Sequence, residues 1–278
     1  MWASYFPILY SNRKNVLWKV IDNSLCVFQK STYSKVNEYE KNWSMAFLPM
    51  PFNYKAFENC VNLLCKLNKL NSVNVHNISN TDMDAIHSKI NCDATFAADG
   101  KDYIYDVSCS KSLTGPDYKK IRYYVKHFER DYSPQVEKYD PSMYKECFKL
   151  TKDWMRRKLE KDDTILYKEH TKEMLKELWM FDDMFGIAVR VKGELVAFSL
   201  GGILLENRQT GTCIIRKTVD GMKGLSEFID WNFYNYLPQK INYVNDGDDC
   251  MSPSLADYKM KWRPAKIQPI FKGTVEAQ

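Results

Sequence analysis

Three carboxylates lie within four positions of the segment VNDGDDC, residues 244–250. Asp246, Asp248 and Asp249 follow KINYV, a run whose apolar alternation is typical of a strand. A carboxylate in such a place can take a proton from an ammonium group or bind a cationic group. Acids this close repel one another, so the pKa of at least one should be raised, which suits a base near neutral pH. The alternative is an Asp-rich turn whose acids cap the next helix or form salt bridges.

A second candidate site is the turn DGMKG, residues 220–224, between a predicted strand and a predicted helix. Backbone N–H groups at the N-terminus of a helix bind phosphate readily. Two glycines at such a turn often have only a structural role, but here cations precede the turn and lie within it. The residues predicted to bind a phosphate-bearing donor are Arg216, Lys217, Gly221, Lys223 and Gly224.

The segment 119–130 interleaves cations with aromatic side chains. In a helix, positions 119, 122, 126 and 130 share one face, which would form a stripe able to track phosphates. The alternative is a solvated outer face whose aromatic side chains point into the core. The residues predicted to contact tRNA or another anionic partner are Lys119, Lys120, Arg122 and Lys126.

Composition excludes several other kinds of site. The 278 residues include 40 Lys and Arg against 35 Asp and Glu, a surplus that ordinary solubility explains. The eight cysteines form no C-x-x-C pair, the four histidines lie in unrelated contexts, and no zinc spacing results. No Walker, G-x-G-x-x-G, G-x-S-x-G or H-E-x-x-H motif occurs. We predict no metal site and no permanently bound cofactor.

The start of the chain and its apolar runs bear on localisation. The first basic residues follow the first apolar stretch, which is the reverse of a signal peptide. The longest apolar run, residues 195–205, has 11 residues, against roughly 20 needed to cross a bilayer. We therefore predict a reduced, cytoplasmic protein with free thiols and no transmembrane segment.

The elements that position these candidates follow from apolar periodicity. In the second half the pattern predicts, in chain order, helices at 141–161 and 167–181, a hairpin at 185–204, a strand at 211–219, a helix at 225–237, a strand at 240–244, a helix at 252–262 and a strand at 265–273. Strands separated by helices late in the chain require a mixed sheet with a crossover connection.

The first half has a similar order of elements. The pattern predicts a hairpin at 16–30, a strand at 45–50, a helix at 54–68, a strand at 72–78, a helix at 81–90, a strand at 102–107 and a helix at 116–132. Residues 131–142, rich in Pro, Asp and Ser, form the candidate boundary. We predict an α+β protein of two domains, 1–138 and 139–278.

Four segments of the sequence resemble one family, in order along the chain. They are DYIYDVSCSKSLTGPDYKKIRYYVKHF, ELVAFSLGGIL, RKTVDGMKGLSEFIDWNF and INYVNDGDDCMSPSLADYKMKWRP. The third resembles the family pattern EKAdp.y.GlyqaiNqeF, and the fourth, the most specific, resembles iNREeDlGlpGLRkAKlSYkP. The family is the phosphatidylglycerol lysyltransferase C-terminal type, the domain-of-unknown-function 2156 group. The resemblance extends from about residue 2 to residue 272.

The resemblance implies two fused domains of the N-acetyltransferase (GNAT) fold, of which the second, 139–278, would carry the donor cleft. It also implies transfer of an activated acyl or aminoacyl group to an amine or hydroxyl acceptor. The donor is aminoacyl-tRNA in the lysyltransferases and usually acyl-coenzyme A in the wider fold. The large flippase of the lysyltransferases is absent from this chain, so we expect a soluble small-molecule or peptide acceptor.

The resemblance also implies roles for single residues. Lys259 matches the family lysine that is expected to stabilise the oxyanion of a tetrahedral intermediate. Asp248 and Asp249 match acidic positions, and with Lys259 they are the predicted catalytic residues. Asn245 and Asp246 are predicted to recognise the acceptor or the acyl group.

The chain departs from the family pattern mainly around its acids. Arg216 stands where the pattern has glutamate, Asp246 and Gly247 where it has arginine and glutamate, and Cys250 where it has leucine. Three hypotheses follow. The chain is an acyltransferase that uses acyl-coenzyme A or an acyl-carrier-protein thioester, an aminoacyl-tRNA-dependent transferase, or a catalytically silent binding protein that keeps the fold.

Overall fold

The computed structural model describes residues 4–30, 42–89, 94–159, 168–177, 180–204 and 208–277. The chain divides into two compact units. Unit 1 comprises Ala3–Asp102 and Gln268–Gln278, and unit 2 comprises Tyr103–Ile267. Strands β5 (Ala94–Asp106) and β11 (Lys266–Glu276) contribute residues to both units. All the candidate site residues fall in unit 2.

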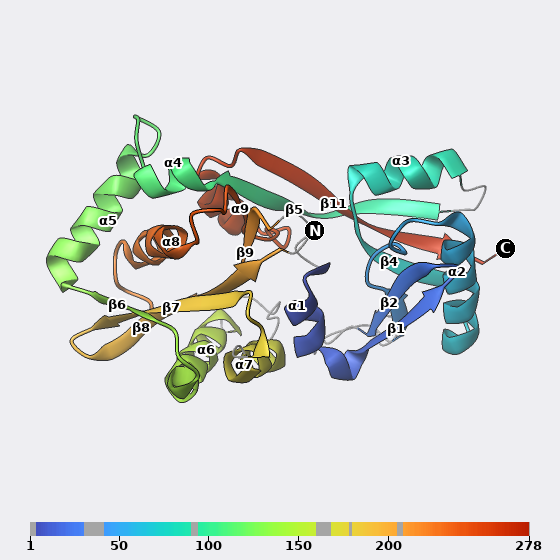
Figure 1. The fold of residues 1–278 in the computed structure, drawn as a ribbon, viewed down its shortest axis with the longest axis horizontal. Coiled ribbons are helices and arrows are strands. Elements are labelled where there is room, and N and C mark those ends of the chain that lie inside the picture. Colours follow the sequence, from blue (N-terminus) through green and yellow to red (C-terminus); the bar gives the residue numbers. More distant parts are fainter. Residues whose placement is uncertain are drawn as a thin grey trace. The chain divides into compact units, whose positions relative to one another are not determined.

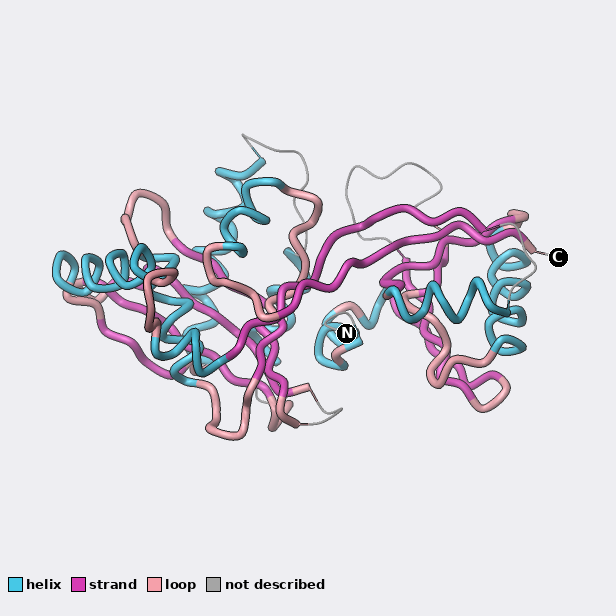
Figure 2. The backbone as a smooth tube through the Cα atoms, turned by 90° about the horizontal axis from the view of Figure 1, so that it is seen from above, coloured by secondary structure: helices cyan, strands magenta, loops and turns pink. Residues whose placement is uncertain are grey.

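Unit 1 is built on a mixed sheet. Its strands lie in the order β1 (Val16–Ile21), β2 (Ser24–Lys30), β3 (Trp43–Met45), β4 (Ser72–Ile78), β11 and the first part of β5. Figure 2 shows β5 and β11 as long neighbouring strands. The helices of this unit are α1 (Phe6–Ser11), α2 (Tyr54–Asn68) and α3 (Asn80–Lys89), with a short 3₁₀ turn, η2, at Arg13–Asn15.

Helix α2 forms and packs for reasons visible in its sequence. The Asn53 side chain accepts hydrogen bonds from the first N–H groups of the helix, which would otherwise lack partners. Apolar side chains recur at helical spacing, so that Phe57, Val61 and Leu64 share the buried face. The helix ends at Lys69, whose left-handed backbone lets its N–H reach the carbonyl of Cys65.

Unit 2 contains a second part of the sheet, flanked by helices. Its strands lie in the order β5, β10 (Tyr243–Asn245), β9 (Thr210–Thr218), β8 (Glu194–Ile203), β7 (Met184–Val191) and β6 (Gln135–Lys138). Strand β10 runs parallel to β9, and the other neighbours are antiparallel. A parallel pair requires a crossover, which helix α8 (Leu225–Tyr236) supplies between β9 and β10.

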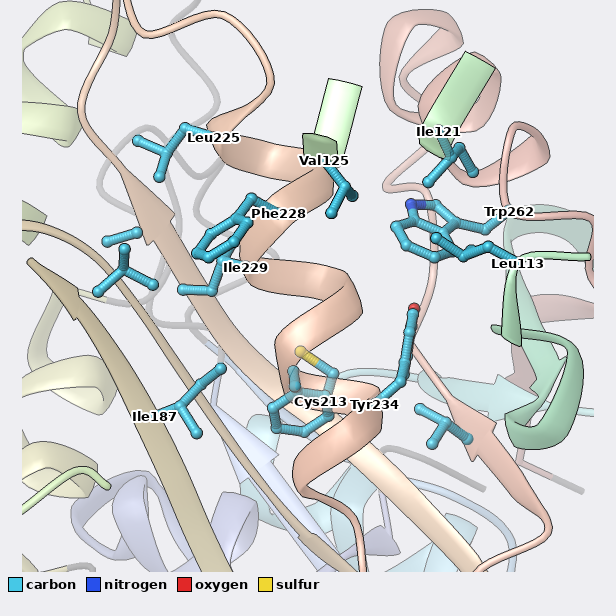
Figure 3. Close-up of a cluster of buried hydrophobic side chains, with 14 of the residues drawn as sticks. Leu113, Ile121, Val125, Ile187, Cys213, Leu225, Phe228, Ile229, Tyr234 and Trp262 are labelled. Carbon is cyan, nitrogen blue, oxygen red and sulfur yellow. The ribbon is translucent and has the colours of Figure 1, made fainter. Parts of the chain in front are cut away.

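Helices cover both faces of this sheet. Figure 1 shows α5 (Lys119–Tyr132) and α8 on one face and α6 (Tyr144–Leu159) and α7 (Lys168–Glu177) on the other. Figure 3 shows Val125 of α5 beside Phe228 of α8, and Ile121 of α5 beside Trp262, in the core. The remaining helical elements of the unit are α4 (Val107–Ser112), η4 (Pro141–Met143) and α9 (Pro253–Met260).

The strongly periodic elements match their predictions. The predicted helix 54–68 and strand 72–78 have the observed bounds, and the hairpin turns at Lys192 and Gly193 with positive φ at both. The predicted strand 45–50 is wrong in extent, because the ladder of β3 ends at Met45. Residues 90, 160–161, 167 and 178–179, which belong to three predicted helices, lie outside the described residues.

Two short α-helices and one short strand were not predicted. Helices α1 and α4 have six residues each, too few to show a helical period, and α4 begins where the Asp106 side chain accepts the N–H of Cys109. Strand β6 lies inside the predicted linker 131–142 and pairs with β7 through residues 135–138. Its polar sequence shows no apolar alternation, so the strand was not predicted.

The predicted boundary between residues 138 and 139 falls inside unit 2, directly after β6. The compact units instead divide near residue 102 and again near residue 267, because the last strand returns to unit 1. A division into two domains at residue 138 stays a prediction. In the described part of the chain, no helix is both long enough and apolar enough to cross a bilayer.

Candidate functional site

A bulge in β9 decides where Arg216 points. Strand β9 pairs with β8, and the register passes from Ile215 to Cys213, so that Ile214 is an extra residue. A bulge of one residue reverses the face on which the following side chains emerge. Arg216 therefore lies on the same face as Cys213, and its Nη2 is 3.3 Å from the Cys213 Sγ. Figure 3 shows Cys213 facing helix α8.

Backbone hydrogen bonds fix the acidic loop that follows β10. The N–H of Asp246 donates to the carbonyl of Tyr103 at 2.9 Å, and the N–H of Tyr103 donates to the carbonyl of Gly247 at 3.2 Å. Gly247 has a φ of 73°, which favours glycine, and its N–H donates to the Oδ1 of Asn245 at 2.9 Å. Asn245 is buried and shapes the loop, and its predicted role in recognition stays a prediction.

Four charged side chains form what we call the buried ion network: Asp230, Arg216, Asp246 and Lys259. Arg216 contacts the Asp230 carboxylate through Nε, and its Nη2 lies 3.0 Å from an Asp246 oxygen. The Lys259 Nζ lies 3.2 Å from the other Asp246 oxygen. The side chains of Asp230, Asp246 and Lys259 are at most 5% exposed. Two acids and two cations balance, as burial of charge requires.

The two acids of the buried ion network differ in pKa. Burial raises the pKa of Asp230 to about 7, although Arg216 lowers it. Burial acts on Asp246 in the same sense, but Arg216 and Lys259 together hold its pKa below the ordinary value. The difference follows from the number of neighbouring cations, since Asp246 has two and Asp230 has one. The Tyr258 hydroxyl also donates to Asp230, at 2.7 Å.

Lys259 is held at the inner side of helix α9. Its Nζ donates to the carbonyls of Asp246 at 2.5 Å and Gly247 at 3.1 Å, and to the Asp246 carboxylate. An ammonium group has three N–H donors, so these contacts use its full capacity. Lys259 therefore braces the acidic loop. The exposed lysine is Lys261, which directly follows this helix.

Asp249 is also engaged by its own chain. One carboxylate oxygen accepts the Tyr103 hydroxyl at 2.8 Å, and the other accepts the N–H of Met251 at 3.1 Å. Burial and this hydrogen bond raise the pKa of Tyr103 to about 12. Helix α9 begins at Ser252 without a side-chain cap, so the alternative in which the acids cap this helix is wrong.

Asp248 is the acid of the loop that lies outside the buried ion network and is not fully buried. It is half-buried, and the Cys250 thiol donates to its Oδ1 at 3.2 Å. Its pKa is raised, mainly by burial, while Cys250 and Lys259 lower it and repulsion by Asp249 contributes least. The pKa of one acid is thus raised, as expected, but burial and not repulsion between the acids is the main cause. A half-buried carboxylate with a raised pKa is suited to accepting a proton.

The structure does not place the five predicted donor-binding residues at one site. Arg216 belongs to the buried ion network, whereas Gly221 and Lys223 are exposed in the turn before α8. The Lys217 Nζ lies 3.8 Å from the centre of the Trp154 ring. Gly224 begins α8 with a φ of 90° and no side-chain cap. Arg216 is therefore corrected from a phosphate ligand to a member of the network, because the bulge turns it inward.

Helix α5 packs against this turn. A Cβ on Gly224 would lie 2.5 Å from the carbonyl oxygen of Tyr124, so the helices approach closely there. The predicted basic residues Lys119, Lys120 and Lys126 are exposed. Arg122 instead donates to the carbonyls of Leu113 and, at 2.7 Å, Gly115, and so holds the preceding loop.

The aromatic side chains of α5 divide between core and surface. Phe128 is buried against Phe228, with ring centres 5.0 Å apart. Tyr123 is exposed, and the Lys223 Nζ lies 5.8 Å from its ring centre. The exposed cations of α5 and the turn 220–224 therefore belong to neighbouring elements.

Sequence reasoning missed Asp230, Tyr258 and Tyr103. Asp230 lies among apolar residues of α8 in LSEFIDWNF, and an acid on the buried side of a helix is the signal that could have identified it. Tyr103 gave no comparable signal, because its partner Asp249 is 146 positions away. In the described part of the chain, no group of three or more His, Cys, Asp or Glu could hold a metal ion.

Comparisons with known proteins identify the relatives of this chain. A family model described as phosphatidylglycerol lysyltransferase, C-terminal, matches residues 37–272. No curated protein matches the chain. Among solved structures, a conserved protein of unknown function from Bacteroides thetaiotaomicron VPI-5482 has a TM-score of 0.80 at 17% identity, with 99% of this chain and 90% of that chain covered.

Two further structures define the fold. L-PGS from Bacillus licheniformis has a TM-score of 0.64 at 14% identity, with 99% of this chain and 93% of that chain covered. A tandem GNAT protein from the clavulanic acid biosynthesis pathway has a TM-score of 0.57 at 8% identity, with 92% and 79% covered. At these identities the likeness concerns the fold alone. It confirms the predicted fold class, an α+β fold of the tandem GNAT type with a mixed sheet.

Proposed function

The chain belongs to the phosphatidylglycerol lysyltransferase C-terminal family, and from this premise we propose that unit 2 transfers an activated acyl group to an amine acceptor. Family and fold point to a GNAT-like acyl or aminoacyl transferase. The observation that carries the proposal is Asp248, a half-buried carboxylate of raised pKa on a loop that the buried ion network holds rigidly.

The proposed reaction begins with removal of a proton from the acceptor. An ammonium acceptor gives one proton to Asp248, and the amine nitrogen then bonds to the carbonyl carbon of the donor. The bond between that carbon and the sulfur or oxygen of the leaving group breaks. The leaving group takes the proton held by Asp248, and the second nitrogen proton passes to solvent. Asp248 is thereby returned to its carboxylate form.

Asp249 and Lys259 are proposed to position Asp248. Both are buried, and both use their polar atoms on the chain itself, Asp249 with Tyr103 and Lys259 with the carbonyls of the loop. A base must be held within hydrogen-bond reach of the proton it accepts, so a braced loop favours catalysis. An oxyanion-stabilising role for Lys259 would require it to leave at least one of these carbonyls.

The preferred donor is acyl-coenzyme A or an acyl-carrier-protein thioester. Lys223 is exposed in a turn that ends at the N-terminus of α8, where unpaired N–H groups and the helix dipole favour phosphate. Aminoacyl-tRNA is the second candidate. It is favoured by the exposed cations Lys119, Lys120 and Lys126 on the neighbouring helix α5.

The test screens the full chain against both donor classes with a panel of small amines and peptides. Intact-mass detection of acylated acceptor with acyl-coenzyme A, acyl carrier protein or charged tRNA identifies the donor. Asp248→Asn should lower turnover by roughly 10²-fold or more, the usual scale for losing a base, while donor binding is retained. Asp257→Asn, an exposed acid of α9, is the matched control. Binding of a donor without turnover in any combination would instead support the silent binding protein.

A further inference from the structure

Strand β1 is the outermost strand of unit 1 among the described residues. Its apolar side chains are exposed, Leu17 by 50%, Trp18 by 70% and Val20 by 59%. Figure 1 shows β1, in blue, with β2 beside it. Proteins usually protect a sheet edge with charge or cover, because an open edge pairs readily with another strand. An apolar edge of this kind indicates an interaction surface.

The β1–β2 turn determines which backbone groups of β1 face outward. Asp22 and Asn23 have φ of 46° and 62°, which makes a two-residue type I′ turn flanked by the pair Ile21 and Ser24. In such a hairpin the flanking pair is hydrogen-bonded, and hydrogen-bonded pairs alternate along the strands. The residues Val16, Trp18 and Val20 therefore direct their N–H and C=O groups away from β2.

We propose that β1 pairs antiparallel with β1 of a second copy of this chain, about a twofold axis at Trp18. In that register Trp18 lies opposite Trp18 of the partner subunit, and Val16 lies opposite Val20 of the partner subunit. All three residues with outward backbone groups then form hydrogen-bonded pairs. The aromatic pair and the β-branched pairs on one face are favourable cross-strand neighbours. This inference is independent of the proposed function.

Charge selects this register over the nearest alternative. An axis at Lys19 would also match the hydrogen-bonding groups, but it would place two ammonium groups directly opposite each other. An axis at Trp18 places Lys19 opposite Leu17 of the partner subunit, so that the two cations lie on opposite sides of the axis. The other neighbouring axis, at Leu17, would leave Val20 opposite Lys14, which lies outside the strand Val16–Ile21. The axis at Trp18 therefore pairs all three outward-facing residues without placing two cations opposite each other.

A second strand suits this edge better than a lipid surface does. The outward N–H and C=O groups need hydrogen-bond partners, which a strand supplies and the interior of a bilayer does not. One short strand pair is small beside the roughly 1,600 Å² of a standard interface, so we expect a weak dimer. The dimer should form at tens of micromolar protein and dissociate on dilution.

The first test is the mass of the full chain in solution from about 5 to 200 µM, measured by sedimentation equilibrium. We expect a shift from a monomer of 32.7 kDa toward twice that mass. Trp18→Lys places like charges at the axis and should abolish the dimer, with the circular dichroism spectrum unchanged because the side chain is exposed. Leu67→Lys, an exposed apolar residue of α2, is the matched control and should dimerise like the wild type.

The second test reads the register directly. Leu17 and Lys19 of the partner subunit form a non-hydrogen-bonded pair, in which Cα atoms lie about 4.5 Å apart, within the range of a disulfide. A chain with both Leu17→Cys and Lys19→Cys should form a covalent dimer on mild oxidation with diamide. Peptide mapping should find residue 17 joined to residue 19. Lys19→Cys alone should not cross-link.

Three results would show that β1 does not pair in the proposed register. They are a wild-type monomer at 200 µM, a Trp18→Lys variant that still dimerises, and a cross-link between two residues 19. A chain that stays monomeric and co-sediments with vesicles of phosphatidylglycerol and phosphatidylcholine, in a way that depends on Trp18, would assign the edge to a lipid surface instead. That result would equally overturn the proposal.

Discussion

The proton on Asp230 gives a direct test of the buried ion network. Burial raises the pKa of Asp230 from 3.8 to about 7 in the folded chain. Between about pH 4 and pH 7 the folded state therefore holds a proton that the unfolded state has lost. Stability falls with rising pH wherever the folded state binds more protons. This carboxyl should thus lower the free energy of unfolding progressively across that window.

Asp230→Asn removes this titration and keeps a side chain of the same shape. Each pH unit corresponds to about 1.4 kcal/mol, so over roughly three units the variant should gain about 4 kcal/mol relative to wild type. The attraction of Arg216 is already contained in the pKa of about 7, because the ion pair exists only while Asp230 is ionised. The free energy of unfolding of the variant, relative to that of the wild type, should be lowest near pH 4 and highest near pH 8.

Urea unfolding followed by circular dichroism at pH 4, 5, 6, 7 and 8 measures the difference at each pH. Asp117→Asn, an exposed acid, is the matched control and should leave the wild-type pH dependence unchanged. A flat difference between Asp230→Asn and wild type would show that Arg216 outweighs burial and keeps Asp230 ionised. A slope of the opposite sign would show that the ion pair depresses the pKa, and the reasoning from burial would then be wrong.

Three further predictions follow from the site. Lys259→Met should lower the free energy of unfolding by about 3–5 kcal/mol, because it breaks a buried ion pair and removes the donor to the Asp246 carbonyl and to one Asp246 carboxylate oxygen. The exposed Lys261→Met should change it little in the same urea assay. Turnover should rise with pH through the raised pKa of Asp248, since the base must be ionised, and an enzyme whose rate is constant down to pH 4 would exclude this role. Gly221→Ala should cost about 1 kcal/mol for its positive φ, and Gly224→Ala about 2 kcal/mol more for its contact with the neighbouring helix, as thermal melts can compare.

Local signals predicted much of the fold. Helix α2 has a strong period and clear caps, and strand β4 alternates buried valines with more exposed polar residues, so their predicted bounds match. The proximity of Lys259 to the acidic loop was also foreseeable, because a short turn and one helix separate them. These predictions need only interactions between neighbours in sequence.

The partners of Arg216 could not be predicted in the same way. Side chains alternate between the two faces of a strand, and this rule places Arg216 on the face opposite Cys213. Only the extra residue at Ile214 reverses that placement. Its partner Asp230 comes from a different element, and the approach of α8 to the sheet depends on packing across the whole core. A one-residue irregularity thus changed a predicted surface ligand into a buried ion pair.

Three departures from the family pattern meet in this network. The pattern has glutamate, asparagine and arginine at positions 216, 230 and 246, where the chain has Arg216, Asp230 and Asp246. Arg216 and Asp246 are in contact, so the two departures exchange the charges of one ion pair. An ion pair depends on opposite charges in contact and not on which partner carries which sign.

This exchange predicts that the three positions change together. Arg216→Glu alone would place three acids in the buried ion network and should prevent folding at neutral pH, because buried like charges are costly. Adding Asp230→Asn and Asp246→Arg restores opposite charges at the contact and should recover a folded chain with a cooperative melt. Asp246→Arg alone, which gathers three cations, should fail like the first variant. A triple variant no more stable than the single ones would mean that packing around the bulge of β9, and not the balance of charge, fixes this centre.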